Sequence, residues 1–361
     1  MNRKTTRTTR SGVSDRASRR IAVIGAGIAG IACARTLAQA GLDVDVFERR
    51  AEVGGRMATR DTAFGSFDEG AQYFTVRDWR FERALETAAS VVKPWSANSV
   101  RVLDSAGRTV AAGLPARDRH WVAVPGMDAL ARHWAKPLAQ RGVLHLQSHV
   151  TRFEADRLDP TRWQLHCTGA SGDDHVASSF DAVLLALPAA PARELIRRSG
   201  LEPTFADRLA ATTVAPCWTL LLAFPQAAQL DLGTLGPHWN AARSTHHRIA
   251  WLARESSKPG RAQIERWTVQ ASSAWSEEHL EDDPARVQAK LIRAFAEVTG
   301  IRAEPGFAAV HRWRDAQTTE PAGRSHLWDA KLKVGACGDW CIGHRVEDAF
   351  ISGLELALAV P

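Results

Sequence analysis

The chain has 361 residues, of which 45% are hydrophobic and 24% charged, the composition of an ordinary globular protein with room for about two domains. Its net charge of +6 is concentrated in residues 1–20, which hold seven Arg or Lys and a single acidic residue. The rest of the chain is therefore close to neutral, which argues against a nucleic-acid partner. We expect residues 1–19 to be a disordered basic leader, because their Arg, Thr and Ser side chains have almost nothing to bury.

The five cysteines are scattered, with neither a C-x-x-C pair nor a zinc-binding pattern, so we expect no bound metal. No apolar run approaches the ~18 residues of a membrane-spanning helix. These features predict a cytoplasmic protein that does not bind a membrane, and they leave its oligomeric state open.

The segment that begins at Arg19 and Arg20 admits two interpretations. Two arginines before an apolar run are typical of a twin-arginine export signal, but such a signal has a featureless apolar stretch and a small-residue cleavage site. Here residues 21–25 instead predict a buried strand, and three glycines at G-x-G-x-x-G spacing lead into a helical pattern that ends at Gly41. The alternating stretch DVDVFE then predicts a second strand, ending in Glu48. We therefore predict a dinucleotide cradle rather than a signal.

Each residue of this pattern meets one requirement of such a cradle. Gly25 allows the tight turn, Gly27 lets a pyrophosphate approach, and Gly30 lets the helix pack on the strand. The helix N-terminus offers free N–H groups to the phosphates, and Glu48 accepts the ribose hydroxyls.

Gly54, Gly55 and Arg56 follow the second strand and indicate which dinucleotide is bound. Two glycines let the backbone pass close to a ligand, and an arginine can bind phosphate through two parallel hydrogen bonds. This trio resembles the second fingerprint of flavoproteins of the amine-oxidase group, which implies FAD.

Near the C-terminus, KVGACGDWCIG predicts a strand that leads to Gly338 and Asp339. In flavoproteins of this type such an aspartate binds the ribityl chain, and the following helix points its positive end at the flavin, favouring the reduced anion.

Over residues 20–360 the chain resembles the bacterial renalase-like FAD-dependent oxidoreductases, a branch of the flavin amine-oxidase superfamily. The resemblance is carried by GAGIAG, VGGRMATR, FDEGAQYFTVRD, SSKPGR, HRWRDA and GDWCIGHRVEDAFISG, among other stretches. It implies an α/β fold in which a doubly wound, Rossmann-like FAD-binding domain is interrupted by a mixed α+β substrate domain. FAD would be bound non-covalently, since no motif resembles the cysteine attachment site of covalent amine oxidases. Its expected contacts are Gly25, Gly27, Ile28, Ala29, Gly30, Glu48, Arg49, Gly55, Arg56, Gln72, Tyr73, Val150, Gly338, Asp339, Val346 and Ala349.

We expect the FAD domain to be discontinuous, because the buried strand in FDAVLLALPAAPA stops at Pro188 and the composition then changes. The expected FAD domain comprises residues 20–90, 121–188 and 325–361, and the expected substrate domain comprises residues 91–120 and 189–324.

Two positions depart from the resemblance. Asp348 stands where a small residue is usual, and Asp315 stands where an aromatic residue is common. The carboxylate of Asp348 suits a helix N-terminus, but close to the flavin it would oppose the reduced anion.

The sequence favours an oxidase. It holds one dinucleotide fingerprint, no redox-active cysteine pair and no GDAAH-like signature, which argues against nicotinamide-dependent reductases, disulfide reductases and aromatic hydroxylases. Hydride would pass from a substrate carbon to flavin N5, and oxygen would be reduced to hydrogen peroxide. No residue stands out as an obligatory acid or base. Lys258 in SSKPGR could orient a water near N5, although we favour an exposed turn lysine.

Three functions remain open. The resemblance implies oxidation of NAD(P)H isomers with hydride at the 2- or 6-position to NAD(P)+, and arginines would bind the phosphates of that substrate. The alternatives are an amine oxidase or desaturase, whose pocket should be acidic or apolar, and a flavin-binding regulatory protein with little turnover. The expected substrate contacts are Tyr73, Arg243, Arg312, Trp313 and Arg314, although these arginines could equally lie on a solvated sheet face.

Overall fold

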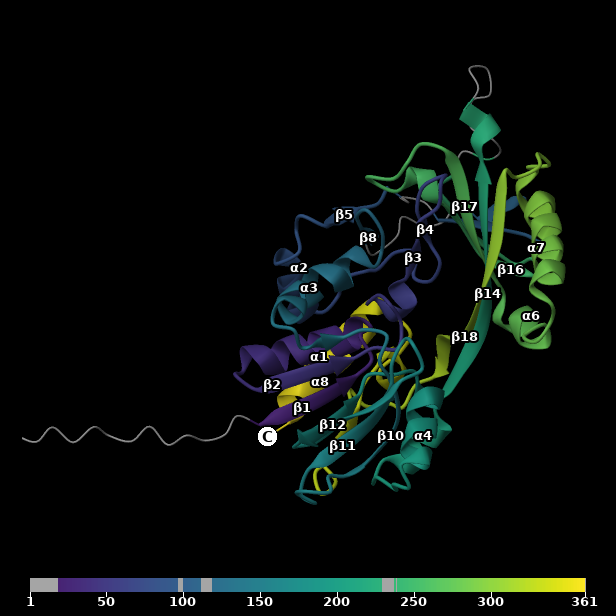
Figure 1. Cartoon of the computed structure of the whole chain (residues 1–361). Coiled ribbons are helices and arrows are strands. Elements are labelled where there is room, and N and C mark those ends of the chain that lie inside the picture. The colour runs from purple at the N-terminus through teal and green to yellow at the C-terminus, as the bar shows by residue number, and fades with distance from the viewer. Residues whose placement is uncertain (1–18, 97–99, 112–118, 229–236, 238, 361) are drawn as a thin grey trace, which may run out of the picture.

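The computed structural model of the chain describes residues 19–96, 100–111, 119–228, 237 and 239–360 (Figure 1). Residues 1–18, nearly all of the expected leader, lie outside the described residues.

A six-stranded sheet forms the centre of one half of the molecule. Its strand order is β19-β20-β13-β1-β2-β9, and all neighbours are parallel except the edge strand β19. The strands are β1 (Arg20–Ile24), β2 (Asp43–Phe47), β9 (Leu144–His145), β13 (Ala182–Leu185), β19 (Leu327–Asp329) and β20 (Val334–Ala336).

Both faces of this sheet are covered, which is why β1 is an almost continuous apolar run. Successive side chains point to opposite faces. Ile21 and Val23 pack against the helices α1 (Ile28–Gln39), α3 (Ala129–Gln140) and α8 (Val346–Ala359). Ala22 and Ile24 pack on the other side, against a three-stranded sheet. Its strands are β10 (His149–Ala155), β11 (Trp163–Thr168) and β12 (Asp174–Phe180).

The second half is built on a seven-stranded sheet of order β18-β14-β17-β16-β15-β6-β7 (Figure 1). The helices α6 (Ser273–Glu278) and α7 (Pro284–Thr299) cover one of its faces. Its other face packs against the first half and is expected to face the cofactor, so it is named the cofactor-facing side. Its strands are β6 (Arg101–Leu103), β7 (Thr109–Ala111), β14 (Thr213–Phe224), β15 (Ala241–Ser244), β16 (Ile249–Arg254), β17 (Glu265–Ala271) and β18 (Phe307–Glu320).

The expected fold class, a Rossmann-like FAD-binding domain with an inserted mixed domain, is confirmed. β13 ends before Pro188, as expected, and α4 (Ala189–Arg198) starts directly after it. The domain boundaries stay a prediction. One detail differs from them, because α4 and α5 (Ala206–Ala211) pack with the three-stranded sheet rather than with the seven-stranded one.

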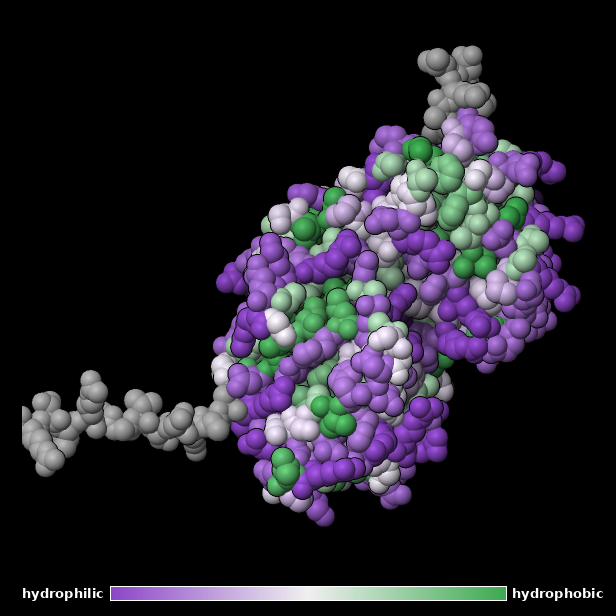
Figure 2. Space-filling view, viewed as in Figure 1, coloured by the Kyte–Doolittle hydropathy of each residue, from purple (hydrophilic) through white to green (hydrophobic). Residues whose placement is uncertain are grey.

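The remaining elements are short. They are η1 (Gly55–Met57), β3 (Thr59–Arg60), β4 (Phe67–Asp68), α2 (Trp79–Glu86), β5 (Val92–Pro94), β8 (Trp121–Ala123), η2 (Pro225–Ala228), η3 (Glu255–Ser257) and η4 (Asp339–Cys341). On the face shown in Figure 2, hydrophobic residues form small separate groups among polar ones. Among the helices of the described ranges, none is both long and apolar enough to cross a membrane.

Candidate functional site

The glycine turn between β1 and α1 is closed toward the protein and open on one side. Gly25 has a φ of +105°, and a Cβ on it would collide with the carbonyl oxygen of Ala186. A Cβ on Gly30 would collide with the carbonyl oxygen of Gly25, so α1 can pack on the turn only because Gly30 lacks a side chain. Around Gly27, by contrast, a Cβ would meet nothing within 4 Å. The space is therefore open where the pyrophosphate is expected.

The N-terminus of α1 keeps backbone donors for an anion. Its N-cap residue, Gly27, has no side chain to accept from them, and no acidic residue stands in the first turn. Ile28 and Ala29 therefore lie at the positive end of the helix dipole, an arrangement that binds phosphate. A Cβ on Gly353 would collide with the carbonyl oxygen of Ala29, so α8 crosses α1 in close contact there.

Glu48 directly follows β2, where the ribose is expected. Its side chain is buried, and its two oxygens accept hydrogen bonds from the backbone N–H groups of Ala26 (2.8 Å) and Arg50 (2.9 Å). Its carbonyl oxygen accepts from the N–H of Ser148 at 2.8 Å, and the buried Val150 follows two residues later in β10. The structure thus brings Glu48 and Val150 to the same edge of the six-stranded sheet.

The second glycine pair lies against the first turn. Gly54 and Gly55 have φ angles of 116° and 56°, and a Cβ on Gly55 would lie 3.3 Å from the Cα of Gly27. Arg56 forms an ion pair with Asp339, in which Nη1 and Oδ2 are 3.1 Å apart. The segment 54–56 and Asp339, which are separated by most of the chain, therefore meet at one place.

The C-terminal part completes this edge. The N–H of Gly338 donates to the hydroxyl of Ser352 at 3.0 Å, and the buried Asp339 follows in η4. Val346 and Ala349 lie in the first turn of α8 and pack into the core cluster that contains α1.

Asp348 caps α8. Its Oδ2 accepts from the backbone N–H groups of His344 and Arg345, each at 3.0 Å. The adjacent Glu347 is also buried and accepts from the N–H of Asp78 at 2.7 Å, which ties α2 to α8. Both carboxylates satisfy backbone donors, and this explains why an acidic residue is tolerated at the position where a small one was expected.

These features fit FAD. The open glycine edge and the uncapped N-terminus of α1 suit the pyrophosphate, and Glu48, Arg56 and Asp339 line the same edge. Residues 23–86 match the NAD(P)-binding Rossmann-like domain, and residues 103–360 match the family of flavin containing amine oxidoreductases. The chain belongs to the flavin containing amine oxidoreductase family. It is an FAD-dependent oxidoreductase.

Solved structures of this family's fold cover almost the whole chain. A candidate protoporphyrinogen oxidase from Exiguobacterium sp. 255-15 has a TM-score of 0.73 at 12% identity and covers 95% of this chain and 99% of its own. Cyclohexylamine oxidase from Brevibacterium oxydans has a TM-score of 0.70 at 14% identity, with 95% and 98% covered. At these identities the likeness concerns the fold.

Curated relatives match over short segments. Hydroxyneurosporene desaturase of Rubrivivax gelatinosus is 38% identical over 74 residues, which are 20% of this chain and 14% of the desaturase. A component of the ferredoxin:CoB-CoM heterodisulfide reductase of Methanosarcina mazei is 43% identical over 58 residues, 16% of this chain and 7% of that protein. The chain thus matches only a small part of the length of these relatives.

Four rings gather at the junction of the two halves. The ring of Tyr73 lies 4.3 Å from His120, 5.5 Å from Trp251 and 6.4 Å from Trp95, measured between ring centroids. Sequence reasoning found only Tyr73. The other three come from distant segments, and no spacing distinguishes Trp95 and Trp251 among the 13 tryptophans.

A row of five residues crosses the cofactor-facing side. Neighbouring strands pair Arg243 with Trp251, Trp251 with Gln270, Gln270 with Thr219, and Thr219 with His311. Paired residues point to the same face, and Trp251 belongs to the core cluster shared with the first half. Arg243 is exposed at one end of the row, and Nε1 of Trp251 is buried without a hydrogen-bond partner among the described residues.

The structure separates the residues expected from HRWRDA. Trp313 points to the cofactor-facing side, where its Nε1 donates to the carbonyl oxygen of Glu69 at 3.0 Å. Arg312 and Arg314 point to the opposite face, as alternation along β18 requires. Both form ion pairs with Glu281, at 3.0 Å for Arg312 and at 2.9 Å between Nη2 of Arg314 and Oε2. They therefore do not join Arg243 and Trp313 on one surface, contrary to the expected substrate set.

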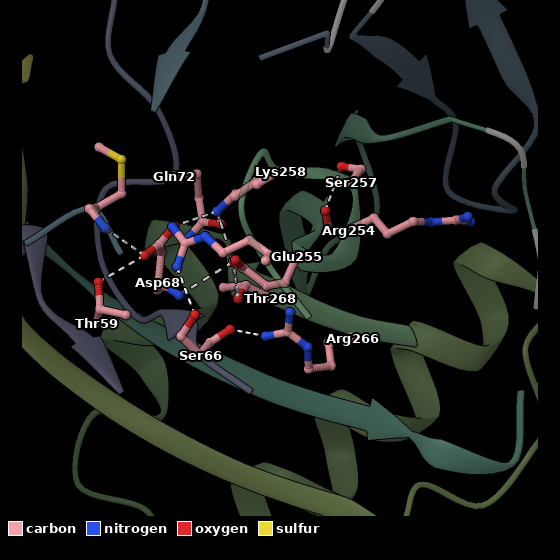
Figure 3. A network of polar contacts seen from close by, with 12 residues as sticks. Thr59, Ser66, Asp68, Gln72, Arg254, Glu255, Ser257, Lys258, Arg266 and Thr268 are labelled. Atoms are coloured by element: carbon pink, nitrogen blue, oxygen red, sulfur yellow. Dashed lines mark hydrogen bonds and ion pairs between the residues drawn. The ribbon is translucent and has the colours of Figure 1, made fainter. Parts of the chain in front are cut away.

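Lys258 is not an exposed turn lysine, and this corrects our expectation. Its side chain is fully buried in a network of charges between the two halves (Figure 3). Its Nζ donates to Asp68 and Glu255, both at 2.8 Å, and Asp68 also accepts from Arg261 at 2.7 Å. Burial alone would raise the pKa of Asp68, but Lys258 and Arg261 outweigh it and hold the pKa below its usual range. Burial raises the pKa of Glu255.

A second cluster of polar side chains surrounds Glu69 on the cofactor-facing side of the seven-stranded sheet. Glu69 is buried, pairs with Arg60 and lies 3.6 Å from Nδ1 of His311. Burial, together with the charges of Arg50 and Arg60, lowers the pKa of His311 to about 4. His311 is therefore a neutral imidazole at neutral pH.

Asp315 lies close to Arg56 and Arg49, two of the expected FAD contacts. Burial raises the pKa of its carboxyl, against the opposing charges of Arg56, Arg49 and Arg314. Where an aromatic residue was expected, β18 therefore carries a half-buried acid next to residues expected to contact FAD.

Proposed function

We propose that this protein is renalase-like and oxidises the 2- and 6-dihydro isomers of NAD(P)H to NAD(P)+, with oxygen reduced to hydrogen peroxide. Bound FAD supplies the hydride acceptor and the route of electrons to oxygen. The residues of the chain bind the substrate and orient its reactive carbon. A cytoplasmic location remains part of this proposal.

The pairing of Arg243 with Trp251 carries the proposal. A dihydronicotinamide dinucleotide combines a flat ring with phosphates, so its site needs aromatic surface beside positive charge. Trp251 contributes its ring to the cluster around Tyr73, and Arg243 stands next to it on the same face of the sheet.

This assignment moves the phosphate contacts away from the arginines of β18. Arg312 and Arg314 are paired with Glu281 on the helix-covered face, whereas Arg243 is exposed on the cofactor-facing side. A phosphate at Arg312 or Arg314 would have to displace Glu281, and it would lie on the far side of the sheet from Tyr73.

An amine oxidase or desaturase is the second candidate. The family and the cyclohexylamine oxidase fold favour it, and an aromatic cluster also suits an apolar amine. Arg243 distinguishes the two, because a cation beside the rings repels a protonated amine and attracts a phosphate. A regulatory flavoprotein, the third candidate, would show slow reduction by every substrate class.

Stopped-flow reduction of the FAD-loaded protein by 6-dihydro-NAD and by alkylamines tests the proposal. One charge-assisted contact at an exposed site contributes about 1.5 kcal/mol, so R243A should weaken dinucleotide binding ~10-fold. The defect should shrink for dihydronicotinamide riboside, which has no phosphate.

R314A is the matched control, since it removes the same charge from the opposite face of the sheet. It should leave the affinity for 6-dihydro-NAD unchanged. Rapid reduction by amines together with no reduction by any dihydronicotinamide would refute the proposal and support the amine oxidase.

A further inference from the structure

Lys258 has every donor of its ammonium group occupied by protein. Its three N–H groups face Asp68 Oδ2 at 2.8 Å, Glu255 Oε1 at 2.8 Å and Gln72 Oε1 at 3.1 Å (Figure 3). A lysine ammonium has three donors and no acceptor. Donation to a water, the flavin or a substrate would therefore break one of these bonds inside a fully buried site.

The three partners of Lys258 belong to both halves of the molecule. Glu255 lies in η3, next to the seven-stranded sheet, and Asp68 and Gln72 lie in the segment that follows β3. Because Gln72 Oε1 accepts from Lys258, its amide nitrogen points the other way and donates to the carbonyl oxygens of Asp68 and Gly70. The side chain of Gln72, only 4% exposed, is thus fixed at both ends of its amide.

The backbone on both sides of Gln72 and Tyr73 is also fixed by hydrogen bonds. Gln270 donates to the carbonyl oxygen of Gly70 at 2.7 Å, and Phe74 exchanges backbone hydrogen bonds with Trp121 at 2.8 and 2.9 Å. Tyr73 stands between these two anchors. Its ring position therefore follows from how its neighbours are bound.

We propose that Lys258 is a positioning residue: by fixing Gln72 it sets the ring of Tyr73 against Trp251, and it does so without touching substrate or flavin. That Tyr73 contacts a dihydronicotinamide rests on the proposed function. The coupling between Lys258 and the Tyr73 ring does not depend on the proposed function.

In K258M the two carboxylates of the network lose one donor each but keep others. Asp68 keeps Arg261, Thr59 and the N–H of Met127 as donors in that variant. Glu255 keeps the hydroxyl of Thr268 at 2.8 Å, and it can take up a proton where burial disfavours its charge. Gln72 is the partner that loses its only side-chain donor in the network.

Tyr73 is the only tyrosine of the chain, so 3-fluorotyrosine gives one 19F NMR signal in the full-length, FAD-loaded protein. K258M should shift and broaden this signal. The matched control is T268V, which removes a hydrogen bond to the same oxygen of Glu255 but leaves Gln72 bound, and it should leave the signal in place. An unchanged signal in folded K258M would overturn the proposal, as would equal shifts in K258M and T268V.

If K258M does not retain FAD, the variant Q72L provides the test of the proposed coupling. It keeps both ion pairs of Lys258 and removes the hydrogen bonds of the Gln72 amide, to Lys258 and to the carbonyl oxygens of Asp68 and Gly70. The 19F signal should again shift, and an unchanged signal would refute the proposal. With 6-dihydro-NAD, K258M should lower the limiting rate of flavin reduction by up to ~100-fold, as a misplaced contact of about 1 Å does. Absence of reduction in the wild type would refute the proposed function. The NMR result would still test whether Lys258 positions the ring of Tyr73.

Discussion

The glycine turn expected to hold the cofactor presents mainly backbone, whereas the cofactor-facing side of the seven-stranded sheet presents side chains drawn from five strands. The cradle depends on the absence of side chains at Gly25, Gly27 and Gly30, and glycines at fixed spacing are visible in a sequence. The row from Arg243 to His311 depends on strand register, which no local pattern records. Sites made of backbone are therefore easier to derive from sequence than sites made by strand pairing.

The largest effect is expected from a substitution that disrupts the glycine turn and leaves the seven-stranded sheet intact. G30A places a methyl group against the carbonyl oxygen of Gly25, and such overpacking against backbone costs on the order of 3 kcal/mol. We expect loss of FAD and a lower melting temperature of the apoprotein.

G27A is the control, because its methyl group enters the open space and meets no protein atom within 4 Å. It should weaken FAD binding and leave the melting temperature of the apoprotein unchanged. Equal melting temperatures for the apoproteins of G30A and G27A would contradict this account of the turn. Acid precipitation should release the flavin from the wild type, as non-covalent binding requires.

The next effect concerns the network between the two halves. Asp68 accepts from Lys258 and Arg261 in a fully buried site, and removal of one partner from such a site costs about 3–5 kcal/mol. D68N should lower the free energy of unfolding by this amount in urea titrations at pH 7. Because the pKa of Asp68 is lowered in the folded state, this stabilisation is present above the unfolded pKa of about 3.9 and is lost as the pH falls through the folded value.

E281Q removes an exposed carboxylate that pairs with Arg312 and Arg314, and it is the control for D68N. Its unfolding midpoint should match that of the wild type. A destabilisation by E281Q as large as that by D68N would mean that burial does not distinguish the two sites.

Much of the first half could be derived from the sequence, and the reasons are physical. β1, β2 and the α1 turn are specified by local apolar runs and glycines, and the resemblance correctly brought Arg56 and Asp339 to one edge. The burial of Lys258 could not be derived, because its partner Asp68 lies 190 residues away. Arg312 and Arg314 were misplaced because the pattern HRWRDA gives the alternation of side chains but not which face turns to the cofactor.

A smaller effect tests the electrostatics at the edge of the row. The pKa of His311 is lowered to about 4 by burial and by Arg50 and Arg60. The unfolded chain takes up this proton near pH 6.5 and the folded chain only near pH 4, so stability falls as the pH drops through that window. H311Q should flatten this part of the stability profile. An identical slope between pH 6.5 and 4 in both proteins would show that other groups cause it.

The smallest expected effect lies at the start of α8, at one of the two positions that depart from the resemblance. Asp348 accepts from the N–H groups of His344 and Arg345, so its carboxylate acts both as a helix cap and as a negative charge at the start of α8. D348A loses both and should cost about 1 kcal/mol, as the loss of a cap does. D348N keeps an oxygen acceptor and loses only the charge, so its stability should stay near that of the wild type. Because a negative charge opposes the reduced flavin anion, D348N should raise the flavin midpoint potential, measured by dye-coupled titration. A rise in D348A without one in D348N would assign the effect to helix geometry instead of charge.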